Sequence, residues 1–300
     1  MHVCIAGGTG FIGDILTQKL LDKGYRVTIL TRSDRTSQQE RLHYAKWLSP
    51  GTLPEKSLQD VDAIVNLAGE SLNAGRWTTA QKEQIIDSRL QATQALTAIA
   101  SKLPHRPSVY IQASAVGIYG TDEDNIFTEE TTTTGSDFLA NTVKAWEAAA
   151  QPLENVGIRV CKMRFGVVLG KDHGALPKIS LPYKLGFGGT VGSGRQWVSW
   201  VHVDDVVGAL LHCLEADVEG VFNTTAPHPE RMKDFGKTVA SVLNRPHWLP
   251  APAFALRAVL GEMSLLVLEG QRVLPERLQQ TGYTFKFPEL KGALQDIYQS

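Results

Sequence analysis

The chain lacks several features that would assign it to a special class of protein. Its three cysteines, Cys4, Cys161 and Cys213, are far apart and odd in number, so neither a disulfide framework nor a zinc site follows. Thirty basic residues balance 31 acidic ones, which leaves no basic excess for nucleic acid. No apolar run reaches the length of about 18 residues that a membrane-spanning helix needs. The chain begins Met1-His2-Val3, without the cationic segment of a signal peptide. We therefore predict a cytoplasmic protein that binds neither nucleic acid nor membranes.

The chain does contain a repeated alternation of β-rich and helical patterns. Strands separated by helices form βαβ units, and the β-rich runs lack polar/apolar alternation, as expected when helices cover both faces of a parallel sheet. The prediction is an α/β fold with a Rossmann-type, doubly wound parallel sheet. The expected strands are residues 2–6, 25–30, 44–48, 61–67, 109–113 and 158–168, and the expected helices are residues 14–23, 79–101 and 138–154.

The pattern changes after Gly170. Residues 170–196 are glycine-rich and loop-like, and a strand at 197–201, a helix at 203–215 and a short strand at 221–223 follow. Most of the remaining prolines lie in the last part of the chain. We predict a Rossmann domain over residues 1–225, with 170–196 on its substrate side, and a smaller C-terminal lobe over 226–300 that covers the cleft.

A glycine-rich turn joins the first expected strand to the first helix. It reads Gly7-Gly8-Thr9-Gly10-Phe11-Ile12-Gly13. In a dinucleotide-binding turn the first glycine permits the bend, the second admits the pyrophosphate, and the third packs helix against strand. We predict that Gly7, Thr9, Gly10, Phe11, Ile12 and Gly13 contact a dinucleotide.

The end of the second strand indicates which dinucleotide is bound. NAD-preferring sites place a carboxylate there, about 20 residues past the glycine turn. This chain has Thr31 and Arg32 instead, and a guanidinium can bind a 2′-phosphate through two hydrogen bonds. Asp34 lies nearby and weakens the argument. The sequence favours NADP(H), with NAD(H) as the alternative.

Several motifs together resemble the short-chain dehydrogenase/reductase superfamily, in its extended, epimerase-like branch. They are the glycine turn, residues 66–70, Ser114, and residues 200–205 (Trp-Val-His-Val-Asp-Asp). Residues 76–77, 88–89, 166–170, 192–195 and 268–275 resemble an atypical subgroup, called epimerase family proteins, that ends in a domain of unknown function. Members of this subgroup bind NADP, and their reaction is generally unassigned.

The proton-transfer pair of active superfamily members is missing. They use a Tyr with a Lys four residues later, because proton transfer needs a group of suitable pKa within hydrogen-bond reach. Counting back from Lys144 places Ala140 at the Tyr position. Counting back from Glu147 places Leu139 and Val143 at the Tyr and Lys positions, where the subgroup often has Cys for the Lys. Neither register contains a tyrosine.

Ser114 corresponds to the catalytic serine of the superfamily, but the run from Ser114 to Tyr119-Gly120 is one residue longer than in extended members. Ser114 is therefore either a catalytic hydrogen-bonding group or a turn residue at a strand end. Tyr119 is a substitute acid/base candidate, although packing of its ring is the simpler interpretation.

Arg89 falls within the apolar stripe of the expected helix at 79–101. A buried charge needs a partner, which a cofactor phosphate, a ribose or a backbone carbonyl could supply. Arg89 replaces an Asn that active relatives place in this helix. We predict a cofactor or active-site role, with snorkelling to the surface as the alternative.

Other candidates lie at strand ends, where α/β sheets bind ligands. We expect Leu67, Ala68, Gly69 and Val168 to line the cofactor, whereas Glu70 either faces the nicotinamide or begins a helix. Asp204 and Asp205 open a helix, so capping and stabilisation of the helix dipole are the simplest explanation for them. The eight histidines show no metal-ligand spacing. Arg195 and Trp197 lie in the stretch that borders the substrate in extended relatives, which suggests a polar or anionic ligand.

The leading hypothesis is an NADP(H)-dependent oxidoreductase or epimerase-like enzyme acting on an unknown small molecule. The alternative is a non-catalytic NADP(H)-binding sensor or interaction protein, which the missing Tyr/Lys pair favours. A homodimer is compatible with the sequence.

Overall fold

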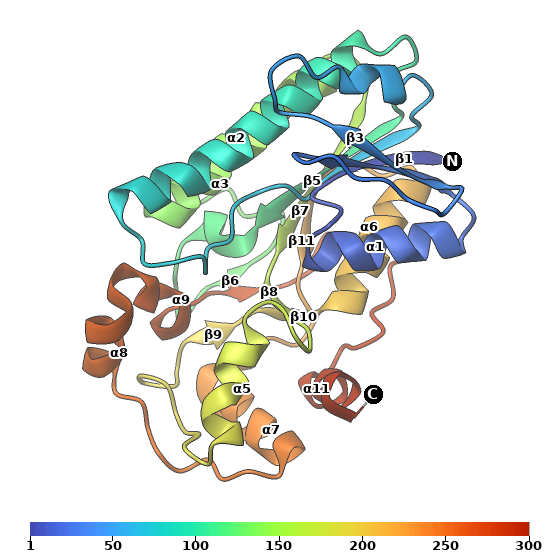
Figure 1. Ribbon diagram of the computed structural model, residues 1–300. Helices are drawn as coiled ribbons and strands as arrows, with labels where there is room; N and C mark the ends of the chain where they lie inside the picture. Colours follow the sequence, from blue (N-terminus) through green and yellow to red (C-terminus); the bar gives the residue numbers. More distant parts are fainter. Residues whose placement is uncertain (300) are drawn as a thin grey trace.

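A seven-stranded parallel sheet forms the centre of the computed structural model, which describes residues 1–299 (Figure 1). Its strand order is β11-β7-β5-β4-β1-β2-β3, and every neighbouring pair is parallel. The predicted Rossmann-type fold is confirmed. The strands are β1 (His2–Ala6), β2 (Arg26–Thr31), β3 (Leu42–Lys46), β4 (Ala63–Asn66), β5 (Val109–Ala115), β7 (Arg159–Phe165) and β11 (Gly220–Thr224).

Helices cover both faces of this sheet. On one face α1 (Phe11–Asp22) and α6 (Val203–Glu215) pack on Val3 and Ile5 of β1. On the other, α2 (Thr79–Lys102) packs on Cys4 and Ala6, with α3 (Phe138–Ala149) and α4 (Gln151–Glu154) beside it. Successive residues of one strand therefore enter different cores, which explains why the strands are apolar throughout.

Most predicted elements exist, with shifted ends. Helix α1 begins at Phe11 rather than at residue 14, because the end of the glycine turn is already helical. The weakly patterned third strand is β3 at Leu42–Lys46, two residues earlier than predicted. The helix predicted at 138–154 is divided at Ala150 into α3 and α4, and Pro152 lies in the first turn of α4.

The prediction of one continuous strand over residues 158–168 is wrong, because two strands, β7 and β8, occupy this stretch. It is broken at Gly166, where a Cβ atom would clash with the carbonyl oxygen of Ser199. After the break, β8 (Val167–Leu169) leaves the main sheet and pairs with β10 (Trp200–His202), while β9 (Trp197–Val198) pairs with β12 (Glu230–Arg231). The main chain is thereby directed away from the sheet, beyond its carboxyl edge.

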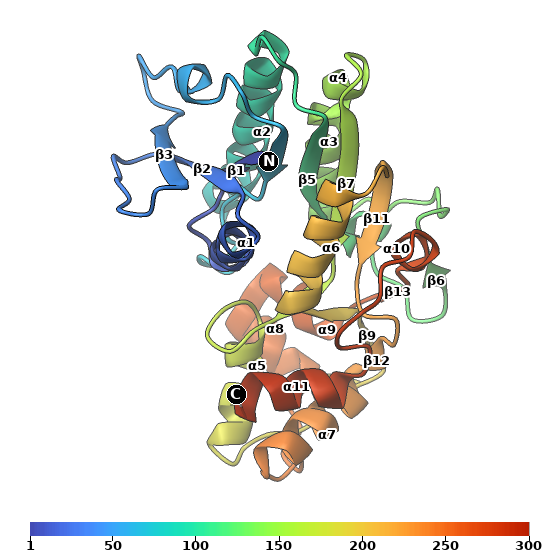
Figure 2. The ribbon, with the colours of Figure 1, turned by 90° about the vertical axis from the view of Figure 1, so that its right-hand side faces the viewer.

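A group of helices lies beyond this edge (Figure 2). The loop-like interpretation of residues 170–196 is incomplete, because α5 (Leu176–Lys184) lies within them and packs against α7 (Met232–Leu243), as does α11 (Leu290–Gln299). The remaining elements are β6 (Ile126–Phe127), α8 (Ala253–Leu260), α9 (Leu265–Leu268), β13 (Arg272–Val273), α10 (Glu276–Gln280) and the 3₁₀ turns η1 (Pro54–Ser57), η2 (Val116–Tyr119) and η3 (Gly261–Ser264).

The last part of the chain is fastened to the first in two places. Strand β13 pairs with β6, which follows β5 along the chain. Asp205 in α6 is fully buried, and its carboxylate accepts hydrogen bonds from the amides of Lys286 and Phe287 and from the Tyr283 hydroxyl. Among the described residues, no helix combines the length and apolarity needed to span a membrane.

Candidate functional site

The glycine turn lies where the strand order reverses, between β1 and β4, which is the usual ligand crevice of open α/β sheets. Gly7 has a φ of 81°, and a Cβ atom there would lie 2.7 Å from the carbonyl carbon of Leu67. At Gly13 a Cβ atom would clash with the carbonyl oxygen of Gly7. Both positions therefore require glycine for the tight approach of turn, helix and neighbouring strand.

The amino end of α1 is open to a ligand. Gly10 is its N-cap and has no side chain to bond the first-turn amides. A Cβ atom at Gly10 would approach only the Gly7 carbonyl oxygen, at 3.3 Å. The first-turn amides and the helix dipole together favour an anion at such a place.

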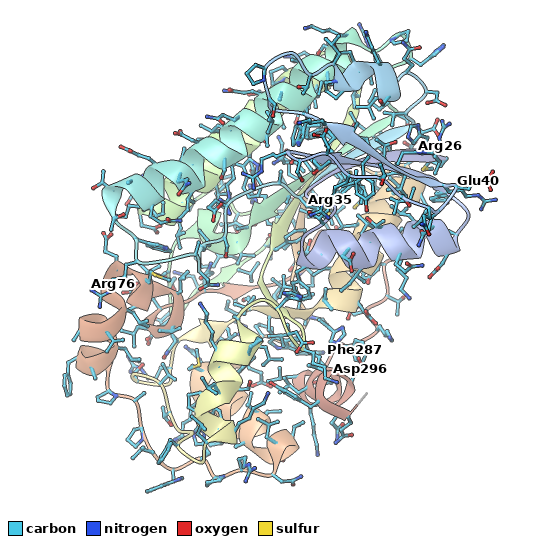
Figure 3. The ribbon with its side chains drawn as sticks, viewed as in Figure 1. Arg26, Arg35, Glu40, Arg76, Phe287 and Asp296 are labelled. Atoms are coloured by element: carbon cyan, nitrogen blue, oxygen red, sulfur yellow. The ribbon has the colours of Figure 1, made fainter. Side chains whose placement is uncertain are left out.

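Two exposed arginines, Arg32 and Arg35, follow β2. Arg35 lines a groove together with Gly8 and Thr9 and lies near the amino end of α1 (Figure 3). The carboxylate of Asp34 accepts a hydrogen bond from Lys46 Nζ at 2.8 Å, so its charge is balanced. Arg35 was not among the residues predicted from the sequence, although its position three residues after Arg32 was a usable signal.

Residues 67–70 follow β4, and buried or half-buried side chains bond to their backbone amides. The buried Asn66 side chain accepts the amide hydrogen of Ala68 and donates toward Tyr110 and Gln112. The amide of Glu70 donates to the Ser88 hydroxyl at 2.9 Å. The turn that faces the glycine loop is therefore rigidly placed.

Arg89 lies beneath that turn. Its Nη1 donates to the carbonyl oxygens of Glu70, at 3.0 Å, and Ile85, at 2.9 Å, and its guanidinium lies over the Trp146 ring. Burial lowers the pKa of Arg89 to about 10, although the charge of Glu70 opposes the shift. Backbone carbonyls are thus the partners that the structure supplies to this inward charge, so it shapes the turn beside the crevice.

Ser114 belongs to a buried polar network. Its Oγ donates to Glu147 Oε1 at 2.5 Å, and the same carboxylate binds Arg164 through Nε at 2.8 Å and Nη2 at 2.9 Å. Burial opposes the charge of Arg164, but its bonds with Glu147 outweigh burial and raise its pKa. Because its hydroxyl is engaged within the protein, Ser114 fits the strand-end role better than the catalytic one.

Tyr119 closes the other end of this network. Its hydroxyl lies 2.9 Å from Arg164 Nη1 and donates toward Asn223 Oδ1 at 2.8 Å. Burial raises the pKa of Tyr119, although Arg164 opposes the shift. A phenol that is harder to ionise and already bonded is a poor substitute acid/base, so the packing interpretation fits better.

The positions expected for the Tyr/Lys pair hold Leu139 and Val143, and no titratable side chain replaces the missing pair at these two positions. Val143 is buried, and Leu139 lines a cavity of about 260 Å³ between α3 and the segment that contains α8 and α9. Lys144 reaches away from this position, because its Nζ donates to the carbonyl oxygen of Gly135 at 2.9 Å. The cavity walls include the aromatic rings of Trp77 and Phe138, which meet edge to face.

A second cavity, of about 400 Å³, lies against the glycine turn. Its lining includes Thr9, Gly10 and Phe11 on one side and His173 on the other. The Phe11 and His173 rings are 5.2 Å apart, and a Cβ atom at Gly170 would clash with the Phe11 ring. Phe11 thus joins the turn to the chain that follows β8, the strand that contains Val168.

Asp204 and Asp205 lie in the first turn of α6, as expected for stabilisation of the helix dipole, but the expectation that they cap the helix is wrong. The cap is His202, whose Nδ1 accepts the amide hydrogen of Asp204 at 3.0 Å. The His202 ring packs 4.1 Å from Phe287, and its Nε2 is 3.5 Å from Asp296 Oδ2; Figure 3 shows Phe287 and Asp296 next to each other. Within residues 1–299, no group of three or more His, Cys, Asp or Glu side chains could hold a metal ion.

Comparison with known proteins extends these observations. Residues 3–224 match the NAD dependent epimerase/dehydratase family, and residues 251–297 match a domain of unknown function, DUF1731. The chain is 46% identical to the epimerase family protein YfhF of Bacillus subtilis over 298 residues, which cover 99% of this chain and 98% of that protein.

Two solved structures are also similar. The human epimerase family protein SDR39U1 (isoform 2), crystallised with NADPH, is 36% identical with a TM-score of 0.89, covering 100% of this chain and 99% of the human one. A nucleoside-diphosphate sugar epimerase from Corynebacterium glutamicum is 29% identical with a TM-score of 0.79, covering 99% of this chain and 58% of that one. The chain belongs to the NAD dependent epimerase/dehydratase family, and the resemblance to its epimerase family proteins is confirmed.

Proposed function

We propose that this protein binds NADP(H) and uses it in a redox reaction of a small molecule at the carboxyl edge of the sheet. The observation that carries this proposal is the glycine turn, where side chains at Gly7 and Gly13 would collide with backbone and no side chain caps the first amides of α1. When bound, the nicotinamide supplies hydride transfer. The similar human protein was crystallised with NADPH, which supports the same choice here.

The residues that would hold the cofactor fall into two groups. Gly7, Thr9, Gly10, Phe11, Ile12 and Gly13 surround the open end of α1, which suits a pyrophosphate. Leu67, Ala68 and Gly69 follow β4, with Leu67 and Ala68 packed against Gly7, and Val168 lies in β8; these residues would line the rest of the cofactor. Arg89 acts on the second group through the carbonyl of Glu70.

The preference for NADP(H) over NAD(H) rests on Arg32 and Arg35. A guanidinium binds a phosphate through charge-assisted hydrogen bonds and has no comparable partner in a ribose hydroxyl. The Thr31 hydroxyl donates to the carbonyl oxygen of Ser33 at 3.0 Å. This bond shapes the turn that follows β2, which carries the two arginines. Since Asp34 is paired with Lys46, its carboxylate does not compete for the arginines.

The substrate would enter the cavity beside Leu139. Its walls combine apolar side chains, such as Leu265 and Leu268, with charged ones, such as Lys82 and Glu269. The hydroxyls of Ser114 and Tyr119 are engaged elsewhere. The proton of the reaction would therefore come from solvent or from the substrate, and the part of the protein would be to orient the substrate.

The test is a calorimetric titration of cofactor-free protein with NADPH and NADH. NADPH should bind more tightly, and Arg32→Ala and Arg35→Ala should each weaken NADPH binding about 10- to 100-fold while leaving NADH binding nearly unchanged, because each removes a hydrogen bond to a charged group. Arg106→Ala, at the opposite edge of the sheet, is the control. Failure to bind either dinucleotide would refute the proposal.

A second function is favoured by one observation. Apolar side chains occupy both positions of the missing pair, and neither candidate hydroxyl is available. An NADP(H)-responsive binding protein needs no proton-transfer group. It would be distinguished by a partner whose affinity differs between NADP⁺ and NADPH, since such coupling is reciprocal, together with no turnover of a carbonyl panel.

A further inference from the structure

Most of the exposed large apolar side chains of residues 1–299 lie in two short segments beyond the carboxyl edge of the sheet. The first segment includes the end of α5, and the second runs from the end of α7 into α8. Figure 1 shows α5 and α7 at the end of the molecule that is far from β3. Five of these side chains, each between 42% and 63% exposed, form what we call the apolar tip: Leu181, Leu185, Phe187, Trp248 and Leu249.

Hydrogen bonds join the two segments of the apolar tip into one surface. The amides of Trp248 and Leu249 both donate to the carbonyl oxygen of Gly188, at 2.9 and 3.1 Å. The indole nitrogen of Trp248 donates to the carbonyl oxygen of Gly186 at 3.0 Å. Trp248 is therefore held beside the segment that carries Phe187, although its side chain is 63% exposed.

The chain around the apolar tip carries positive charge and no negative charge. No Asp or Glu occurs in residues 173–203 or in residues 235–261. Two of the cations in these stretches are paired with carboxylates from elsewhere, Lys237 with Asp234 and Arg195 with Glu123. The whole chain has a net charge of −1, so the excess is local to this end of the molecule. The cations that are exposed and lack a carboxylate partner among the described residues are Lys178, Lys184, Arg245 and Arg257.

The charge of this surface narrows what can cover it. A symmetric contact between two copies of the chain would bring the same unpaired cations together, which opposes association. An anionic surface attracts them instead. Tryptophan, phenylalanine and leucine beside lysine and arginine are typical of protein surfaces that lie in the headgroup region of a bilayer. A bilayer also adapts to side chains that protrude, whereas a folded partner must supply a groove of matching shape.

We propose that the apolar tip docks this protein on the surface of a membrane that contains anionic phospholipids. Phe187 and Trp248 enter the headgroup region, and Lys184 and Arg245 contact the anionic headgroups. The prediction that the chain binds no membrane rested on the lack of an apolar run long enough to span one, whereas the fold assembles this surface from two distant segments. The second segment continues into α8, whose Arg257 lines the proposed substrate cavity, so the docked surface adjoins a wall of that cavity.

The experiment is sedimentation of the full-length protein with sucrose-loaded vesicles of phosphatidylcholine, alone or mixed with phosphatidylglycerol. The wild type should bind the mixed vesicles more tightly, and added salt should reduce the difference. Trp248→Ala and Phe187→Ala should each weaken binding to the mixed vesicles about 10-fold, because each removes a large apolar side chain from the contact. The double variant Lys184→Gln with Arg245→Gln should weaken it about 10- to 30-fold and leave binding to phosphatidylcholine alone unchanged.

Matched controls lie at η1, in the Rossmann part of the molecule. Leu53→Ala removes an exposed apolar side chain and Lys56→Gln an exposed cation, and both should bind vesicles like the wild type. Thermal melting of every variant separates loss of the surface from loss of the fold. NADPH affinity should be the same in the wild type and in all the tip variants, because the apolar tip does not contact the glycine turn.

Several outcomes would overturn the proposal. Failure of the wild type to bind the mixed vesicles would do so and would favour an acidic partner protein as the occupant. Binding that Trp248→Ala leaves unchanged would show that charge alone accounts for it, and equal losses in the control variants would show that the effect is not local. A wild type that is dimeric without vesicles and becomes monomeric in Phe187→Ala would assign the apolar tip to a second copy of the chain.

Discussion

The buried ion pair between Glu147 and Arg164 makes a quantitative prediction. Both side chains are about nine-tenths buried, and two hydrogen bonds of 2.8 and 2.9 Å join them. Glu147→Gln keeps the size of the side chain but leaves Arg164 as a buried charge, with the Tyr119 hydroxyl and ring as its remaining partners. Removing one member of a buried pair typically costs about 3–5 kcal/mol, and we expect that loss in the free energy of unfolding.

Urea unfolding, followed by tryptophan fluorescence, measures the loss. Asp234→Asn breaks the exposed pair of Asp234 with Lys237 and should cost less than about 1 kcal/mol. A double variant, Glu147→Leu with Arg164→Met, should be more stable than Glu147→Gln, because replacing both members leaves no uncompensated charge. A cost of Glu147→Gln no greater than that of Asp234→Asn, or a double variant that is the least stable of the three, would contradict this prediction.

Two other predictions concern helix ends. Gly13→Ala should lower the free energy of unfolding by about 1–3 kcal/mol and weaken NADPH binding, because the added Cβ would collide with the Gly7 carbonyl. Gly292→Ala has open space in α11, so it should be neutral or stabilising in the same melting and titration assays. Burial lowers the pKa of His202 below 6.5. The unfolded chain therefore takes up the proton first on acidification, and stability falls as the pH drops below about 6.5. His202→Asn can still accept from the Asp204 amide but does not titrate, so its urea stability should depend less on pH; an equal dependence would contradict this account.

The parts of the fold that depend on local pattern were predictable from the sequence. The glycine turn, the strand–helix alternation and α6 follow from spacing and turn residues, and all are present. The break at Gly166 was not predictable, because it is imposed by the carbonyl oxygen of Ser199, which lies on a different strand segment. Helix α5 was missed because Pro177 and Pro182 obscure its pattern, although proline is tolerated in a first turn.

The candidate site divides in the same way. Position after a strand was enough to select Gly7 and Arg32 as candidates. The partners of Ser114 were not accessible, because Glu147 and Arg164 come from a helix and a strand far along the chain. Likewise, nothing in the local sequence joins Trp248 to the segment that carries Phe187, which backbone hydrogen bonds between distant parts of the chain bring together.

The burial of Asp205 has a consequence for dissecting this protein. The amides of Lys286 and Phe287 are hydrogen-bond partners of its carboxylate, so a fragment ending near residue 225 would leave that carboxylate without these donors. The same cut would strip β13 from β6 and leave an unpaired strand edge, which invites aggregation. The two stretches recognised as separate families are therefore expected to unfold in one cooperative transition, and fragments should be divided elsewhere or not at all.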